Sequence, residues 1–276
     1  MIRAAAIPLT AALLLVSCGK SDSSAAPAPA PSQTAAMASA PPVPPAPPTP
    51  LPVTARKVSE KNDLYEFTYS YPASAGTVAG LKTSLDADLN TRLAKLKSEA
   101  AAARKDAAKD GYPYNPWYWS QEWKVVTDLP GWLSLSAEYA NYTGGAHGMQ
   151  WFGTMLWDRQ AGKARDPLSL FQSKAALSSA IRKPFCAELD RQRVKKRGEP
   201  LSAARSSMFE ECVDPLKQTV IVGSASGKAF DRIGILVAPY EAGPYAEGTY
   251  EVTVPVTPAV VAAVRPEFRS SFAALR

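Results

Sequence analysis

The sequence predicts an α+β fold in which largely antiparallel sheets pack against helices. Strand-type alternation and helical spacing occur in separate runs along the chain, which disfavours a parallel doubly wound sheet. Short glycine-rich segments join several of the predicted strands, as expected for a meander. Residues 56–276 suffice for one large domain or two smaller ones. We divide them into a first half, 56–165, and a second half, 166–276, which either fold independently or share one sheet.

The first half is predicted to contain one long helix among strands. Aromatic residues alternate with polar ones over residues 65–71, which predicts a strand with one apolar face. Leucines recur every three or four positions from Leu81 to Leu96, which predicts a helix that ends near Gly111. A loop over residues 112–119 follows. Further strands are expected at 122–127, 132–142 and 149–157, the last two joined by a glycine-rich turn at 143–148.

The second half is predicted to begin with helices and to continue with strands. Helical spacing covers residues 175–196, although Pro184 should kink that helix or divide it in two. A shorter helix is expected at 201–212, and strands are expected at 218–222, 232–238 and 249–256. Pro258, directly after Thr257, marks the start of a final helix.

The amino terminus has the features of a lipoprotein signal peptide over residues 1–17. A short apolar stretch follows Arg3, and the residues before Cys18 resemble the lipobox of bacterial lipoproteins. This resemblance implies cleavage before Cys18 and lipid anchoring by acyl chains such as palmitate; the alternative is an ordinary secreted protein. Residues 18–55, rich in proline and alanine, are predicted to form an extended tether. Gly19 replaces the Asp of an inner-membrane retention signal, so we expect attachment to the outer membrane, facing the periplasm.

Two cysteines remain after Cys18, and they form an even pair in a chain expected to be exported. Cys186 and Cys212 are therefore predicted to form a disulfide, which would stabilise the fold by about 3 kcal/mol. The alternatives are two buried thiols or a zinc site. Zinc is disfavoured because the chain has a single histidine, His147, far away in the sequence.

Basic residues give the chain a formal net charge of +6 and concentrate in residues 181–205. One interpretation is a surface for anionic lipid or acidic wall polymer. The other is that the cations at 191–197 form the solvated last turns of a helix that ends at Gly198. Nucleic acid is not an expected partner for an exported protein.

Aromatic residues give the better indication of a binding site. All six tryptophans lie between residues 117 and 157, and such side chains suit stacking against sugar rings or protein contacts. We predict that Trp117, Tyr118 and Trp119 form an exposed binding loop. His147, on a glycine-rich turn, either binds a ligand or fixes the turn. Four tryptophans are predicted to lie in the core: Trp123, Trp132, Trp151 and Trp157.

Three motifs resemble one family of domains of unknown function. They are residues 141–148 (NYTGGAHG), 166–171 (DPLSLF) and 238–248 (APY followed by PYAEG). Similar domains form the ectodomain of the anti-sigma factor RsiV and the amino terminus of the peptidoglycan deacetylase PdaC. The resemblance implies a PdaC-like first half and an RsiV-like second half. It also implies binding, since RsiV captures lysozyme with this region and PdaC catalyses in a separate domain.

The residues do not favour catalysis. A single histidine cannot build a multi-histidine metal site, and no serine stands in a Gly-x-Ser-x-Gly motif. We therefore expect no enzyme activity, metal or cofactor. The predicted function is a membrane-anchored module that binds cell-wall glycan (peptidoglycan) or an envelope protein. The alternatives are a lysozyme-binding protein and a cryptic cell-wall hydrolase.

Overall fold

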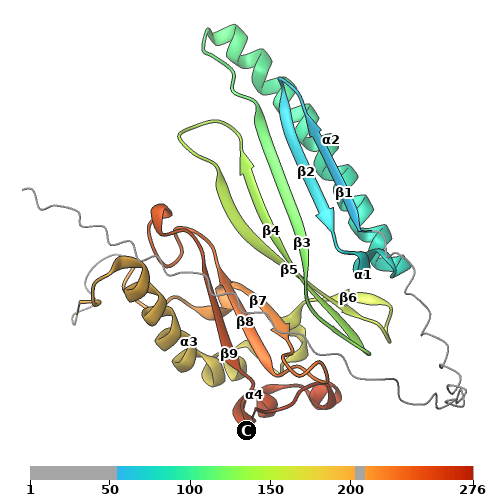
Figure 1. Cartoon of the computed structure of the whole chain (residues 1–276), viewed down its shortest axis with the longest axis vertical. Coiled ribbons are helices and arrows are strands. Elements are labelled where there is room, and N and C mark those ends of the chain that lie inside the picture. Colours follow the sequence, from blue (N-terminus) through green and yellow to red (C-terminus); the bar gives the residue numbers. More distant parts are fainter. Residues whose placement is uncertain (1–54, 203–208, 276) are drawn as a thin grey trace, which may run out of the picture. The chain divides into compact units, whose positions relative to one another are not determined.

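The computed structural model describes residues 55–202 and 209–275, which all lie in the compact unit Thr49–Arg276 (Figure 1). Within this part the chain forms a six-stranded sheet and a three-stranded sheet, each with packed helices. The predicted α+β class is confirmed, and the described halves form separate sheets rather than one shared sheet. The predicted signal peptide, Cys18 and nearly all of the tether lie outside the described residues.

The first sheet has its strands in sequence order, β1 to β6. Every neighbouring pair is antiparallel except β2 and β3, which are parallel. The strands are β1 (Arg56–Lys61), β2 (Tyr65–Tyr71), β3 (Trp117–Leu129), β4 (Trp132–Tyr142), β5 (Met149–Asp158) and β6 (Lys163–Arg165). A parallel pair needs a long crossover, and helix α2 (Ala79–Asp110) supplies it. A short helix, α1 (Ala73–Gly76), precedes α2.

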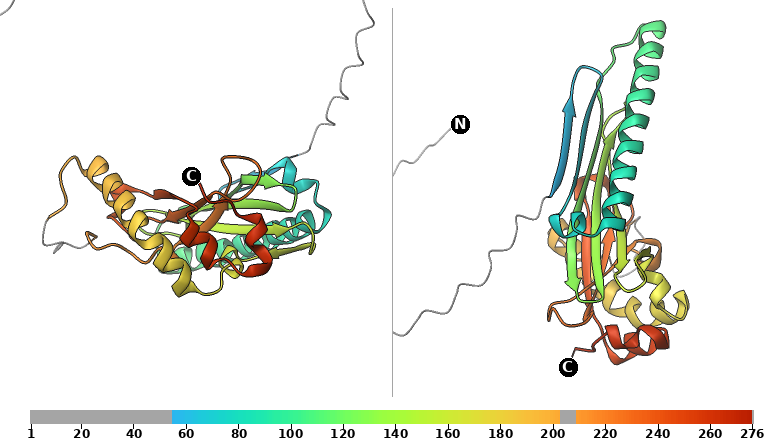
Figure 2. Two further views of the ribbon diagram at one scale, coloured as in Figure 1. Left: turned by 90° about the horizontal axis from the view of Figure 1, so that it is seen from below. Right: turned by 90° about the vertical axis from the view of Figure 1, so that its right-hand side faces the viewer.

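Helix α2 covers one face of the first sheet (Figure 2, right). Its leucine stripe is buried except for Leu93, which is half-buried, and the aromatic residues of β2 are buried in the same core. Gly111 ends the helix with a left-handed φ of 77°, and its N–H donates to the Ala107 carbonyl. The leucine spacing and the alternating aromatics therefore predicted this layer correctly.

The second sheet has the antiparallel order β7-β8-β9 and packs against α3. Its elements are β7 (Thr219–Gly223), β8 (Arg232–Val237), β9 (Tyr250–Pro255), α3 (Lys174–Arg197), α4 (Pro258–Ala263) and the 3-10 helices η1 (Pro167–Leu170), η2 (Pro215–Lys217), η3 (Tyr245–Glu247) and η4 (Pro266–Ser271). Helix α3 continues through Pro184 without a break. Buried residues on both sides of the proline, Ile181 and Phe185, pack both parts of the helix against the same core. Thr257 caps α4 by accepting from the Val260 N–H. Residues 203–208, half of the helix predicted at 201–212, lie outside the described residues. The described remainder, 201–202 and 209–212, is not helical, so that part of the prediction is wrong.

The two sheets meet in a shared core. Leu129, Trp132 and Leu156 of the first sheet belong to the hydrophobic cluster of the second half, and Trp132 Nε1 donates to Ser271 Oγ at 2.9 Å. The predicted disulfide between Cys186 and Cys212 is present, with their Cα atoms 5.5 Å apart. Within residues 55–202 and 209–275, no helix combines the length and hydrophobicity needed to cross a membrane.

Candidate functional site

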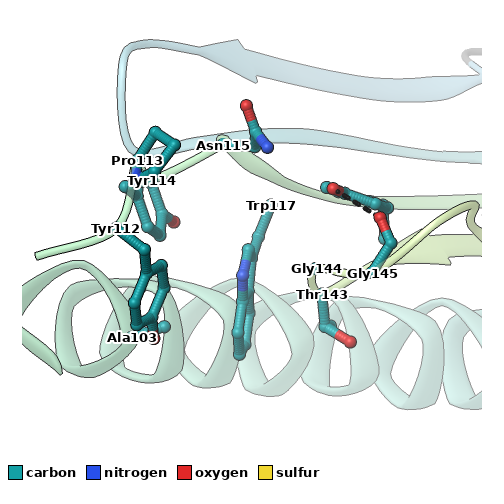
Figure 3. A pocket seen from close by; sticks show the side chains of 10 residues that line it. Ala103, Tyr112, Pro113, Tyr114, Asn115, Trp117, Thr143, Gly144 and Gly145 are labelled. Carbon is teal, nitrogen blue, oxygen red and sulfur yellow. Dashed lines mark hydrogen bonds between the residues drawn. The ribbon is translucent and has the colours of Figure 1, made fainter. Parts of the chain in front are cut away.

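A cavity of about 360 Å³ opens at the end of the first sheet where β3 begins and β4 ends (Figure 3). Its walls come from α2, from the segment before β3 and from the turn between β4 and β5. The lining residues are Ala103, Tyr112, Pro113, Tyr114, Asn115, Trp117, Tyr142, Thr143, Gly144 and Gly145. Figure 3 shows the Tyr112 and Trp117 rings projecting toward α2. Tyr112 is 54% exposed, so this aromatic cavity is open to solvent.

Local contacts fix the walls of the aromatic cavity. The Tyr114 hydroxyl donates to the Leu64 carbonyl at 2.7 Å, and the Trp117 N–H donates to the same oxygen at 3.3 Å. These bonds attach the segment before β3 to the turn between β1 and β2. On the other wall, Gly144 and Gly145 have φ values of 99° and 93°, a backbone conformation that a larger side chain would strain. At these two glycines the wall therefore presents backbone, and Tyr142 beside them contributes a ring whose hydroxyl donates to the Gly145 carbonyl at 3.1 Å.

A second cavity, of about 120 Å³, adjoins the aromatic cavity. The two share Trp117 and Thr143. Helix α2 contributes charged residues to the second cavity, while β3 and β4 contribute aromatic and amide groups. Its lining residues are Arg92, Lys95, Leu96, Glu99, Trp117, Tyr118, Trp119, Asn141 and Thr143. We call it the charged cavity.

The prediction that Trp117, Tyr118 and Trp119 form an exposed loop is wrong. These residues are the first three of strand β3, and they are half-buried. Trp117 pairs with Tyr65 of β2, which extends the sheet further than the prolines before it suggested. All three residues nevertheless line the charged cavity, and Trp117 lines both cavities. Whether they bind a ligand stays a prediction.

The Trp119 side chain packs mainly against the hydrophobic core of the first half. Its ring meets the rings of Tyr139 and Trp151 edge-on, with centroids 6.0 and 5.5 Å away. Its Nε1 atom is buried and has no hydrogen-bond partner among the described residues. Among the tryptophans predicted to lie in the core, Trp123, Trp132 and Trp157 are buried, whereas Trp151 is half-buried.

A polar network lies beneath the charged cavity and positions Arg92. Asp88 accepts hydrogen bonds from Tyr69 Oη at 3.1 Å, Gln121 Nε2 at 2.9 Å and Arg92 Nε at 3.1 Å. The Arg92 guanidinium lies over the Trp119 ring, 4.9 Å from its centroid. Burial raises the pKa of Tyr69, and it raises the pKa of nearby Tyr139 to about 12, so both stay neutral at physiological pH. Sequence reasoning missed this network because its members are far apart in the chain.

His147 lies in neither cavity. It is exposed on the turn between β4 and β5, and its ring stacks on Tyr245 with centroids 4.0 Å apart. Its Nε2 atom lies 3.1 Å from the Tyr240 hydroxyl, and the Tyr245 hydroxyl donates to the Gly148 carbonyl at 2.9 Å. Among the described residues, no carboxylate is hydrogen-bonded to His147. The motifs at 141–148 and 238–248, distant in sequence, therefore meet here.

The basic stretch at 191–197 is less solvated than we expected. Helix α3 does end at Arg197, and Gly198 follows in a left-handed conformation. However, Arg193 is fully buried and donates to the carbonyls of Ala242 at 2.9 Å and Glu211 at 3.0 Å. Arg197 is paired with Glu247 at 2.8 Å. Lys196 donates to the carbonyls of Glu247 and Thr249. The loop before β9 supplies the Ala242, Glu247 and Thr249 acceptors, and Glu211 supplies another.

Comparison with known proteins confirms the family resemblance. Residues 58–150 match the family model described as "Deacetylase PdaC". The fold is similar to that of a DUF3298 family protein from Pseudomonas aeruginosa PAO1, at 16% identity and a TM-score of 0.50, over 82% of this chain and 98% of that one. A DUF3298 family protein from Bacteroides fragilis is similar at 17% identity and a TM-score of 0.48, over 73% of this chain and 89% of that one.

These findings support the resemblance of residues 58–150 to the PdaC family model. The likeness to the Pseudomonas structure shows the fold alone. No curated protein matches the sequence significantly. In the part of the chain that the structure describes, no group of three or more His, Cys, Asp or Glu side chains could hold a metal ion.

Proposed function

We propose that this protein is a non-catalytic module of the bacterial envelope that binds cell-wall glycan in the aromatic cavity beside Trp117. The carrying observation is an open cavity of about 360 Å³ whose walls combine four aromatic side chains with exposed turn backbone. Sugar rings stack on the faces of tryptophan and tyrosine, and their hydroxyls exchange hydrogen bonds with polar groups at the rim. The rings belong to Tyr112, Tyr114, Trp117 and Tyr142. Asn115 and Thr143 supply polar side chains at the edge.

The lining chemistry supports binding without catalysis. Glycoside hydrolysis ordinarily needs two carboxyl groups flanking the bond, and Glu99 contributes the one carboxylate among the residues that line the two cavities. His147, the chain's single histidine, lines neither. A hydrolase acting in this place would therefore lack its acid and base pair.

The proposal places the module in the envelope. Acyl chains on Cys18 would hold the protein on a membrane, the outer membrane in a cell that has one, with residues 18–55 as the tether to the folded part. A proline-rich tether of this length would let the cavity reach the wall from the membrane surface.

Co-sedimentation with purified cell-wall sacculi tests the proposal. We would use residues 49–276, because this compact unit contains both hydrophobic cores and the disulfide. We expect retention at low and high salt, and loss of retention in Trp117→Ala and Tyr112→Ala. Tyr240→Ala, which removes a ring of comparable exposure from the His147 cluster, is the matched control and should be retained. Absence of wild-type retention at either salt would refute wall binding.

Two further assays discriminate the remaining candidates. Binding to lysozyme by a protein that ignores sacculi would move the function to lysozyme capture, as in RsiV. Release of soluble wall fragments by the wild type, abolished in a folded His147→Ala variant, would establish a hydrolase instead. We expect neither result.

A further inference from the structure

We propose that the bound glycan carries a carboxylate and that Arg92 in the charged cavity recognises it. This inference rests on the proposed function. The ligand class is a glycan in which an uncharged sugar alternates with a sugar acid. The uncharged sugar would occupy the aromatic cavity, and the acid would lie in the charged cavity next to it.

The two cavities form one continuous site. Trp117 and Thr143 line both, so a ligand that stacks on Trp117 reaches Arg92 without leaving the surface. The chemistry changes along this path. The residues that line the aromatic cavity include no charged side chain, whereas Arg92, Lys95 and Glu99 line the charged cavity.

Arg92 is held in place by its neighbours, and its two terminal nitrogens, Nη1 and Nη2, are available to bind a ligand. Its Nε donates to Asp88 at 3.1 Å, and its planar group lies over Trp119. Among the described residues, its Nη1 and Nη2 atoms donate to no protein group. A guanidinium with both ends available matches the two oxygens of a carboxylate. An arginine already fixed by its neighbours loses little freedom when it makes these bonds.

The neighbouring charges leave room for an anion. Asp88 uses one carboxylate oxygen for Arg92 and the other for Tyr69 and Gln121, so its hydrogen-bonding capacity is directed toward the protein. Lys95 and Glu99 form a loose pair at 3.7 Å with both side chains more than half exposed, so solvent screens their attraction. Around the cavity itself two cations face one carboxylate.

The test compares the binding of two matched oligosaccharides to the protein comprising residues 49–276. The first probe is a peptide-free tetrasaccharide of alternating N-acetylglucosamine and N-acetylmuramic acid, whose lactyl groups carry carboxylates. The second is the methyl ester of the same tetrasaccharide, which has the same rings and no charge. We expect the wild type to bind the acid about tenfold more tightly than the ester, measured by calorimetry.

Variants connect that preference to the guanidinium. Arg92→Gln should lose the preference while keeping affinity for the ester, and Arg92→Lys should keep part of it because a lysine lacks the fork. Lys163→Gln, an exposed cation on β6 at the opposite end of the sheet, is the control and should behave as the wild type. Circular dichroism would verify that each variant is folded.

The outcomes separate this inference from the proposed function. Equal wild-type affinity for acid and ester, with both lost in Trp117→Ala, would overturn the carboxylate inference and leave glycan binding intact. A preference that survives in Arg92→Gln would overturn the role of Arg92. Failure of both oligosaccharides to bind would reject the proposed function, and the inference with it.

Discussion

The two halves of this protein differ in how far their characteristic side chains are exposed: the aromatic residues of the first half and the basic residues of the second. In the first half, aromatic residues at the start of β3 stay half-buried and line two adjoining cavities. In the second half, Arg193 near the end of α3 is buried, and Lys196 and Arg197 are bonded to carbonyl oxygens and to Glu247. A charge run in a sequence can therefore be structural, whereas an aromatic cluster can remain open to a ligand. The predictions below test this difference, from the largest expected effect to the smallest.

Arg193→Ala should be the most destabilising single change. The guanidinium is fully buried, and its removal leaves the carbonyls of Ala242 and Glu211 without their donors. We expect a loss of about 3–5 kcal/mol in the free energy of unfolding, measured by urea titration. Arg191→Ala, on the same helix but with its side chain 65% exposed, should cost less than about 1 kcal/mol. Similar costs for both variants would contradict the structural assignment of Arg193.

Removing the disulfide should produce the next largest effect. The bond between Cys186 and Cys212 closes a loop with a sequence separation of 26. Replacing both cysteines by alanine should lower the free energy of unfolding by about 3 kcal/mol. A reducing agent should lower the stability of the wild type and leave the double variant unchanged. A wild type indifferent to reduction would contradict the prediction.

Acid should weaken the second half through Glu247. Burial alone would raise the pKa of this carboxyl, but hydrogen bonds from Arg197 and Tyr250 outweigh burial and hold the pKa below its ordinary value of 4.5. Its ionised form therefore stabilises the fold fully above about pH 4.5, and this contribution is lost as the pH falls below that value. Unfolding titrations on either side of that pH should show a smaller acid-dependent loss in Glu247→Gln than in the wild type. An identical acid dependence in the two proteins would contradict the stabilising role of ionised Glu247.

Tyr112→Ala should have the smallest effect on stability. The ring is 54% exposed, so its removal should change the free energy of unfolding by less than about 1 kcal/mol. The same variant should lose retention on sacculi, because the ring forms one wall of the aromatic cavity. A destabilisation as large as that of Arg193→Ala would mean that this ring is structural.

The sequence predicted the layers better than the site. Alternation in β2 and the leucine stripe of α2 are local patterns, so the first layer followed from them directly. Strand β1 was missed because Val58 stands among polar residues, and β6 has three residues, too few for a pattern. The loop prediction for Trp117 gave way to sheet pairing with Tyr65, which local residues do not reveal.

The candidate site depends on contacts between distant parts of the chain. The clustering of tryptophans indicated the correct region, but Arg92 joins Trp117 only because the crossover helix α2 runs along the sheet, and Thr143 joins it only because β4 pairs antiparallel with β3. Likewise, the burial of Arg193 depends on carbonyls of residues 210–211 and 242. Spacing along the sequence carries no signal for such contacts.

The most direct test compares the aromatic cavity with the basic stretch in one experiment. Residues 49–276 would be sedimented with sacculi at high salt as the wild type, as Trp117→Ala, and as the double variant Arg191→Gln and Lys195→Gln, whose cations are exposed. We predict that the wild type and the double variant are retained, and that Trp117→Ala stays in solution although it remains folded. Retention of Trp117→Ala together with release of the double variant would contradict the account and assign wall binding to the end of α3.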